Sequence, residues 1–179
     1  MGRWDGPALA VARSLVGSVL TTQSTVGRTS VTITEVEAYG GSDDPASHAF
    51  RGRTPRNAPM FGPGGTIYVY RSYGLHWCLN IVTGEADNPQ AVLIRAGWPG
   101  EGRALMEQRR GRVDHLADGP GKLTAALGID DSIDGMHIEA LETVSITGPG
   151  SQVDCEWKRR VGLTLAADRP WRCVLIATG

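Results

Sequence analysis

The sequence has little of several features that mark particular classes of protein. It has three cysteines, Cys78, Cys155 and Cys173, and their odd number and wide spacing argue against a disulfide framework and indicate a reducing compartment. No run approaches the roughly 20 apolar residues of a membrane helix, and the first residues lack the apolar segment of a signal peptide. No pair of cysteines or histidines has the spacing of zinc ligands. We therefore expect no membrane association, no secretion and no metal site.

Lysine is scarce, and acidic residues are absent from one long stretch. The chain has 16 arginines against two lysines and a net charge of −1. No acid stands between Asp44 and Glu85, where four arginines fall: Arg51, Arg53, Arg56 and Arg71. A coding bias that replaces lysine by arginine would explain the ratio but not the missing acids. Because the guanidinium fork suits phosphate oxygens, this window predicts a contact with nucleic acid.

The remaining composition, with 41% apolar and 21% charged residues, is that of an ordinary globular protein. We expect a single domain over residues 1–179, of the α+β class. Its curved, mainly antiparallel, open-barrel-like sheet would have surrounding helices and a protruding β-hairpin. The expected helices cover residues 7–19, 102–112 and 119–127, and the expected strands cover 30–39, 66–72, 76–82, 91–96, 144–146 and 171–176.

Two charged side chains fall within these apolar strands. The first expected strand is β-branched and roughly alternating, which places Glu37 and Tyr39 on the same face as Val31 and Ile33. A buried carboxylate without a partner is too costly, so Glu37 needs a partner or a catalytic role. Arg95, near the end of a later apolar strand, is the candidate partner. A purely structural Glu–Arg pair is the alternative.

The best hairpin candidate joins residues 66–72 and 76–82 through a three-residue turn, in which Gly74 can adopt the positive φ that such loops need. This loop length pairs 72 with 76, 70 with 78 and 68 with 80, and it places on one face Tyr68, Tyr70, Cys78 and Asn80. Tyr73 is then an exposed aromatic at the tip, which can enter a base stack and fill the gap left by an extruded nucleotide. The alternative is a turn aromatic that lies flat on a neighbour.

The segment 40–65 is rich in glycine and proline, and so long a loop in a compact domain is usually functional or disordered. Four aromatic side chains could line a slot for a flat ring such as a nucleobase, or form an ordinary core cluster: Tyr39, His48, Tyr68 and Tyr70. Asn80 could read a base edge or face water at a strand end. Lys122, at a helix start after two glycines, suits a phosphate, although this segment is not a P-loop.

Several strings occur in a specific order and spacing: EVEAYGG (35–41), ASH (46–48), TPRN (54–57), MFG (60–62), YVYRSYG (68–74) with Asn80, VLIRA (92–96) and GPGKL (119–123). With them the chain resembles the alkyladenine (3-methyladenine) DNA glycosylase family, the methylpurine type, over nearly its whole length. One departure is Cys173, where the family usually has phenylalanine and then a further short tail.

The resemblance implies roles for the candidate residues. Glu37 is implied as the general base that activates the attacking water, and Arg95 as the residue that helps to hold this water and the carboxylate. The implied purine pocket consists of Tyr39, His48 and Tyr70, with the backbone around Ala46 and His48 at the exocyclic edge of the base and Asn80 against guanine.

The resemblance also implies contacts with DNA. Tyr73 is implied as the intercalating residue, flanked in the minor groove by Met60, Leu75 and His76. From the arginine window and the helix start we expect backbone contacts by Arg53, Thr54, Arg56 and Lys122.

The implied activity is that of a monofunctional DNA glycosylase of base excision repair. It would flip alkylated or deaminated purines out of double-stranded DNA and leave an abasic site, as a monomer without a cofactor. We expect it in a bacterial cytoplasm, or in a nucleus if the source is eukaryotic. Two alternatives remain: a non-catalytic damage-binding module, which needs neither Glu37 nor Arg95, and a hydrolase of free nucleosides, which needs no Tyr73.

Overall fold

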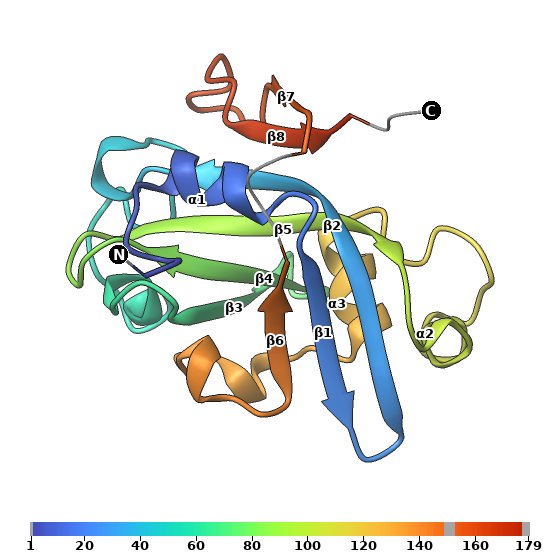
Figure 1. The fold of residues 1–179 in the computed structure, drawn as a ribbon. Coiled ribbons are helices and arrows are strands. Elements are labelled where there is room, and N and C mark those ends of the chain that lie inside the picture. The colour runs from blue at the N-terminus through green and yellow to red at the C-terminus, as the bar shows by residue number, and fades with distance from the viewer. Residues whose placement is uncertain (1, 149–152, 177–179) are drawn as a thin grey trace.

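The computed structural model describes residues 2–148 and 153–176, and it confirms the α+β class with a curved antiparallel sheet (Figure 1). Its strands are β1 (Val19–Ser24), β2 (Gly27–Tyr39), β3 (Ile67–Ser72), β4 (His76–Thr83), β5 (Gln90–Pro99), β6 (Val144–Thr147), β7 (Cys155–Lys158) and β8 (Arg172–Leu175). Its α-helices are α1 (Ala8–Leu15), α2 (Arg103–Arg110) and α3 (Pro120–Leu127). No helix in the described ranges is long and apolar enough to cross a bilayer.

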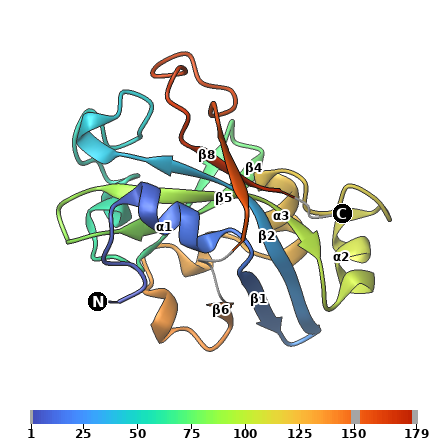
Figure 2. The same ribbon diagram turned by 45° about the horizontal axis from the view of Figure 1, so that its top comes forward.

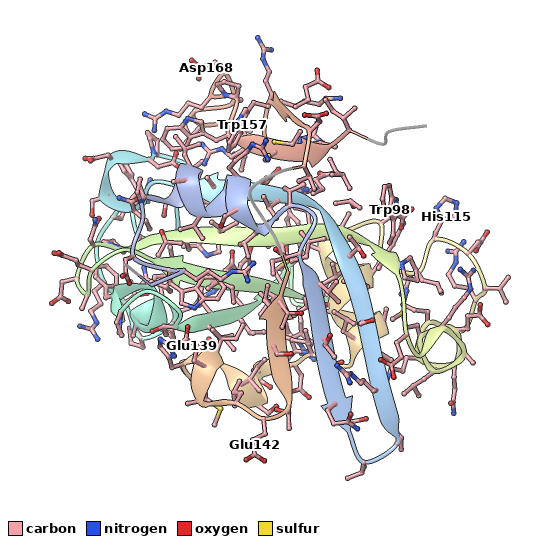
Figure 3. All side chains as sticks on the ribbon, in the orientation of Figure 1. Trp98, His115, Glu139, Glu142, Trp157 and Asp168 are labelled. Carbon is pink, nitrogen blue, oxygen red and sulfur yellow. The ribbon has the colours of Figure 1, made fainter. Side chains whose placement is uncertain are left out.

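The long strand β2 organises the sheet, whose main order is β3-β4-β5-β2-β1-β6. One edge of β2 pairs with β5, and the other edge is shared between two partners. β1 pairs with residues 27–32 of β2, whereas β8 pairs with residues 35–37. The β7–β8 pair therefore stands apart from β1, as Figures 1 and 2 show. In Figure 3, the labelled Trp157 of β7 and Asp168 of the segment before β8 lie in this outer part of the molecule.

A pair of compensating bulges in β2 and β5 decides which side chains enter the core. Ile33 pairs with Gly97 and Glu35 pairs with Ala96, so Thr34 is an extra residue on β2. Glu35 to Val36 on β2 then spans Ala96 to Ile94 on β5, so Arg95 is the extra residue there. An extra residue reverses the side on which the following residues point.

The reversal corrects one expectation from the sequence. Val36 and Ala38 join Val31 and Ile33 in the hydrophobic core, which α1 and α3 cover. Glu37 and Tyr39 therefore face the opposite side of the sheet, together with Glu35. The expected placement of Glu37 and Tyr39 on the Val31 face is wrong because strict alternation ignores the bulge.

The hairpin β3–β4 has the expected register, with Tyr68 opposite Asn80 and Tyr70 opposite Cys78. The first helix is shorter than expected, because it ends at Leu15 and the chain turns at Gly17, where φ is +83°. Residues 19–24 form β1 instead, since there they can pair with both β2 and β6.

The strand β7 was not expected, and it brings together two cysteines that are distant in sequence. Cys155 and Cys173 are free thiols on adjacent strands, and the Sγ of Cys173 donates a hydrogen bond to the Sγ of Cys155.

Candidate active site

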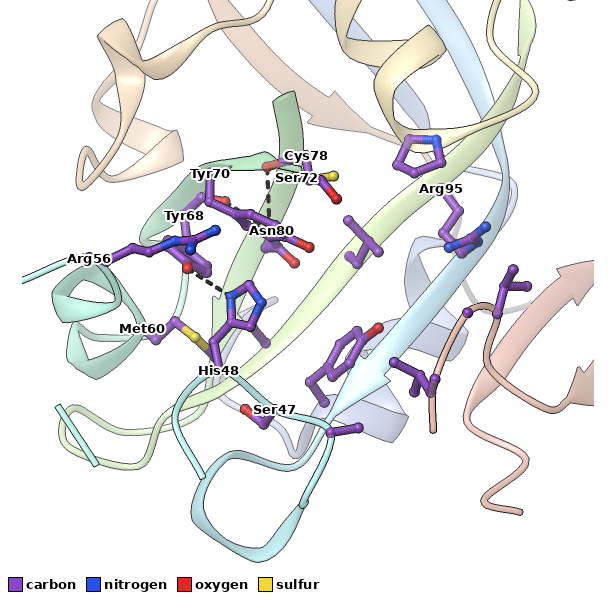
Figure 4. A pocket seen from close by; sticks show the side chains of 18 of the residues that line it. Ser47, His48, Arg56, Met60, Tyr68, Tyr70, Ser72, Cys78, Asn80 and Arg95 are labelled. Atoms are coloured by element: carbon purple, nitrogen blue, oxygen red, sulfur yellow. Dashed lines mark hydrogen bonds between the residues drawn. The ribbon is translucent and has the colours of Figure 1, made fainter. Parts of the chain in front are cut away.

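A pocket of about 410 Å³ opens on the face of the sheet opposite the core (Figure 4). Its walls come from β2, β3, β4 and β5, from the loop at residues 46–48, from residues 161–163 and from Pro120 at the start of α3. The volume lies in the range of sites that bind small flat molecules. Of the expected pocket residues, the structure brings together Tyr39, Ala46, His48, Tyr70 and Asn80, with Arg95 beside them.

One wall of the pocket is a group of three rings. Tyr68 and Tyr70 point the same way from β3, and their rings stack with centroids 5.3 Å apart. The His48 ring meets Tyr70 edge-on at 4.5 Å, and its Nδ1 lies 2.9 Å from the Tyr68 hydroxyl. The loop and the hairpin thus form a rigid aromatic surface, on which a planar base can stack.

The titratable groups of this wall are held in their neutral forms. Burial raises the pKa of Tyr68 to about 12, and burial also raises the pKa values of Tyr39 and Tyr70. Partial burial lowers the pKa of His48, and the nearby Arg56 guanidinium lowers it further. The wall therefore presents uncharged rings at neutral pH.

The Glu37 carboxylate is 0% exposed and lies behind residues that line the pocket. Its Oε2 accepts a hydrogen bond of 2.8 Å from the Tyr39 hydroxyl, and its Oε1 accepts one of 2.7 Å from the backbone N–H of Val161. Nη1 of Arg95 is 3.5 Å from the same Oε1. An ionised carboxylate has about four acceptor positions, so Glu37 keeps capacity for a further donor.

A second carboxylate, Glu35, adjoins this group. Its Oε1 accepts a 2.8 Å hydrogen bond from Nε of Arg95 and a 3.1 Å hydrogen bond from Nη1 of Arg172. Arg95 and Arg172 reach it from β5 and β8, the two neighbours of β2 at this level. Two carboxylates and two guanidiniums therefore form a charge-balanced network.

Asn80 and Ala46, which are expected to contact the nucleobase, already use part of their hydrogen-bonding capacity within the protein. Asn80 is 4% exposed, so the alternative of a polar residue facing water is wrong. Its Nδ2 donates to the carbonyls of Tyr68 and Cys78, which leaves its Oδ1 as the group available to a ligand. The N–H of Ala46 donates to Asp44, so Ala46 can offer a ligand only its carbonyl or its side chain.

The expected minor-groove residues separate into two groups. Tyr73 is 92% exposed at the hairpin tip, with Leu75 and His76 exposed next to it, so an aromatic lying flat on a neighbour is excluded. Met60 is 2% exposed and packs with Ala49 and other buried residues beneath the pocket. The short helix at residues 58–61 turns Met60 inward, where it lines the pocket, so in the free protein it offers almost no surface to a DNA groove.

The residues that are expected to contact the DNA backbone differ in how many contacts they make within the protein. Arg53 is exposed and lies over the Phe61 ring, with Asp87 at 4.0 Å. Arg56 lies over Tyr70 and donates to the carbonyl of Arg71, so it also belongs to the pocket rim. The Thr54 hydroxyl accepts from the N–H of Asn57, and the Nζ of Lys122 donates to Asp118 at 2.9 Å.

Sequence reasoning missed two groups of the network around Glu37, the Val161 N–H and Glu35. The Val161 N–H belongs to a segment without regular structure, and nothing in its local sequence marks it. Glu35 could have been found from the sequence, because it lies two residues before Glu37 in an apolar strand and the two side chains therefore share a face. No group of three His, Cys, Asp or Glu side chains in residues 2–148 and 153–176 could hold a metal ion.

The chain is similar to known proteins over nearly its whole length. The chain matches the family described as "Methylpurine-DNA glycosylase (MPG)" over residues 3–178. A protein of Rhodopseudomonas palustris strain BisB18 is 47% identical over 164 residues, covering 90% of this chain and 79% of the relative. Relatives from Frankia casuarinae (44% identical; 94% of this chain, 84% of theirs) and Agrobacterium fabrum (45%; 92% and 82%) are similarly close. All three bear the name "Putative 3-methyladenine DNA glycosylase".

Proposed function

The chain belongs to the methylpurine-DNA glycosylase family and is therefore a hydrolase of N-glycosyl bonds in DNA, and we propose that Glu37 activates the water for this hydrolysis. The observation that carries the proposal is the position of its carboxylate. Glu37 is fully buried, and its two polar neighbours Tyr39 and Arg95 both line the aromatic pocket. A carboxylate held in such surroundings has a fixed orientation toward a bound sugar.

The damaged nucleotide enters the pocket by rotating out of the duplex. The glycosidic bond of a stacked base is out of reach of a buried carboxylate, so this rotation must precede the chemistry. It costs a few kcal/mol in lost stacking and pairing. Tyr73, exposed at the hairpin tip, offsets part of that cost by occupying the vacated place in the stack. The ring wall of His48 and Tyr70 then receives the base.

The hydrolysis passes through a sugar with the character of an oxocarbenium ion. The Glu37 carboxylate stabilises this positive charge and accepts the proton of the attacking water. Nη1 of Arg95 stands 3.5 Å from the carboxylate on the side of β5, where it can help to orient the attacking water. Because Glu37 has no exposed surface in the free protein, the attacking water reaches it from the side of the pocket, which its neighbours Tyr39 and Arg95 line.

The leaving base and the product follow from the charges available. Alkylated purines already carry a positive charge and depart readily, whereas neutral damaged purines need a proton or a hydrogen bond at the base. Neither Lys122 nor Lys158 lines the pocket, so the described pocket residues supply no lysine amine to form a Schiff base with the sugar. The expected product is an intact strand with an abasic site.

The test compares the wild-type protein with Glu37→Gln in single-turnover release of base. The substrates are a duplex with one hypoxanthine or ethenoadenine, and methylated DNA. The amide preserves the shape of the carboxylate but cannot accept the proton, so we expect release to fall by at least about 100-fold with duplex binding retained. Glu101→Gln, a surface substitution at the Arg28–Glu101 ion pair, is the matched control. Release by Glu37→Gln at the wild-type rate would refute the role of Glu37.

A further inference from the structure

The strongest hydrogen-bonding partner of Arg95 is Glu35 rather than Glu37. Nε of Arg95 donates to Oε1 of Glu35 over 2.8 Å, whereas its Nη1 stands 3.5 Å from Oε1 of Glu37, beyond an ordinary hydrogen bond. Arg95 is 15% and Glu35 21% exposed at the side chain, so water weakens this contact little. Arg95, which adjoins the proposed general base Glu37, is therefore oriented mainly by Glu35.

The bulges in β2 and β5 create this arrangement. Arg95 is the extra residue on β5, and only the pair Glu35–Ala96 separates it along the ladder from Thr34, the extra residue on β2. Bulges commonly re-aim a side chain beside an active site. Here the extra residue Thr34 turns both Glu35 and Glu37 to the pocket face, with the guanidinium of Arg95 between the two carboxylates.

Glu35 is in turn held from the other edge of β2. Nη1 of Arg172 donates to the same Oε1 over 3.1 Å, and Nε of Arg172 donates to the carbonyl of Arg159 over 2.8 Å. With Arg172 in place, Glu35 is a fixed anchor rather than a mobile side chain. This anchor competes with Glu37 for the guanidinium of Arg95.

We propose that Glu35 is a positioning residue for the glycosylase reaction, which keeps Arg95 from pairing fully with Glu37 and so leaves the base free to accept a proton. The inference rests on the proposed role of Glu37. A base in a full ion pair is less basic and has fewer acceptor positions for water. Without Glu35, Arg95 would close the 3.5 Å gap to Glu37, because no other carboxylate would hold it there.

The titratable and charged groups around the two carboxylates make the pH profile a usable readout. Tyr39, Tyr70 and Cys78 stay protonated from pH 5 to 8, because burial raises the pKa of each. Burial and the Arg56 guanidinium lower the pKa of His48 in wild type and variant alike, so His48 does not contribute to a difference between them. The remaining groups stay charged throughout: the guanidiniums of Arg95, Arg172 and, beyond Tyr39, Arg160, with its carboxylate partner Asp44, whose pKa is lowered by Arg160.

The experiment measures single-turnover base release from the hypoxanthine duplex between pH 5 and 8.5 for wild type, Glu35→Gln and the control Glu101→Gln. For Glu35→Gln we expect the plateau rate to fall by about 10- to 100-fold, as a small misplacement of catalytic groups does. On the acid side of the pH profile, the rate should begin to fall at a lower pH than in wild type, since the lost negative charge and the closer approach of Arg95 both stabilise negative charge in the site. The Kd for the duplex should stay within about threefold of wild type.

Two results would overturn the inference. One is an unchanged rate of base release. The other is a lower rate whose fall in acid comes at the same pH as in wild type, because that would indicate a structural role alone. If Glu35→Gln does not fold, Glu35→Asp replaces it. This shorter carboxylate keeps the charge but cannot reach both guanidiniums, so both effects should be smaller and in the same direction. Wild-type release that survives in Glu37→Gln would instead refute the proposed function, which separates the two failures.

Discussion

Among single side chains, Asp44 and Arg160 form an ion pair in which neither side chain is exposed. Both oxygens of Asp44 accept from the guanidinium, which also lies 4.8 Å from the Tyr39 ring centroid. The pair joins the segment that carries Val161 to the loop that carries His48. One buried contact thus holds two walls of the pocket together.

We expect Asp44→Asn to destabilise the protein by about 3–5 kcal/mol, because it leaves the Arg160 charge buried without its partner. Burial by itself would raise the pKa of Asp44, but Arg160 and the N–H groups of Gly40 and Ala46 lower it. The stabilisation is therefore complete above the unfolded pKa of about 3.9 and is lost as the pH falls through the lower folded pKa.

Urea unfolding between pH 7 and pH 3 checks this expectation. The wild-type free energy of unfolding should drop in acid more steeply than that of Asp44→Asn, which has no such carboxyl to protonate. Asp114→Asn, at an exposed ion pair with Arg112, should leave the midpoint unchanged. Equal midpoints for wild type and Asp44→Asn at pH 7 would contradict the argument.

At the scale of elements, the β3–β4 hairpin carries an aromatic residue that the fold does not need. Tyr73 is 92% exposed, and its backbone has a φ of +52°, which is uncommon for a residue with a side chain. Gly74 follows with a φ of +68°, so two residues of the three-residue turn adopt the left-handed conformation, and Tyr73 points outward.

Tyr73→Ala should leave the melting temperature unchanged and slow base release from duplex DNA by about 5- to 150-fold, equivalent to the roughly 1–3 kcal/mol of one base–aromatic stack. Release from a single-stranded oligonucleotide should change little, since no duplex stack has to be filled. Val26→Ala, an exposed apolar residue at the tip of the β1–β2 hairpin, is the control. Wild-type rates on the duplex would show that Tyr73 does not take part in flipping.

For the whole molecule, the net charge of −1 conceals an uneven distribution. The acid-free window places Arg53 and Arg56 on the loop beside the pocket and Arg71 on the hairpin. Arg28 belongs to the β1–β2 hairpin and is paired with Glu101. The cations near the pocket can neutralise phosphates in a way that the overall charge does not indicate.

We expect the affinity for duplex DNA to fall as salt rises, with a slope that reflects a few phosphate contacts. Removing a contacting cation should reduce this slope by about one, so Arg53→Ala should flatten it and weaken binding to all sequences alike. Fluorescence anisotropy between 50 and 200 mM salt would measure this, with Arg28→Ala as the control. A slope for Arg53→Ala equal to that of wild type would exclude Arg53 from the interface.

Local chemistry made much of this protein predictable from its residues. The hairpin register follows from the turn length and from the alternation of Tyr68 and Tyr70 with apolar neighbours. Helix α3 follows from Pro120 at its start and Gly128, with a φ of +70°, just after its end. These signals are contained within a few consecutive residues, so no distant partner is needed to interpret them.

Other features depend on residues that meet only in the folded chain. The paired bulges at Thr34 and Arg95 reflect how two long strands share one curved sheet, so alternation alone put Glu37 on the wrong face. Residues 19–24 became a strand because partners lie on both sides of them. The Val161 N–H reaches Glu37 across 124 positions of sequence. Pairing between distant strands thus determines how Glu37 is held. Such contacts leave no periodic trace in the sequence around either partner, so only the tertiary structure shows them.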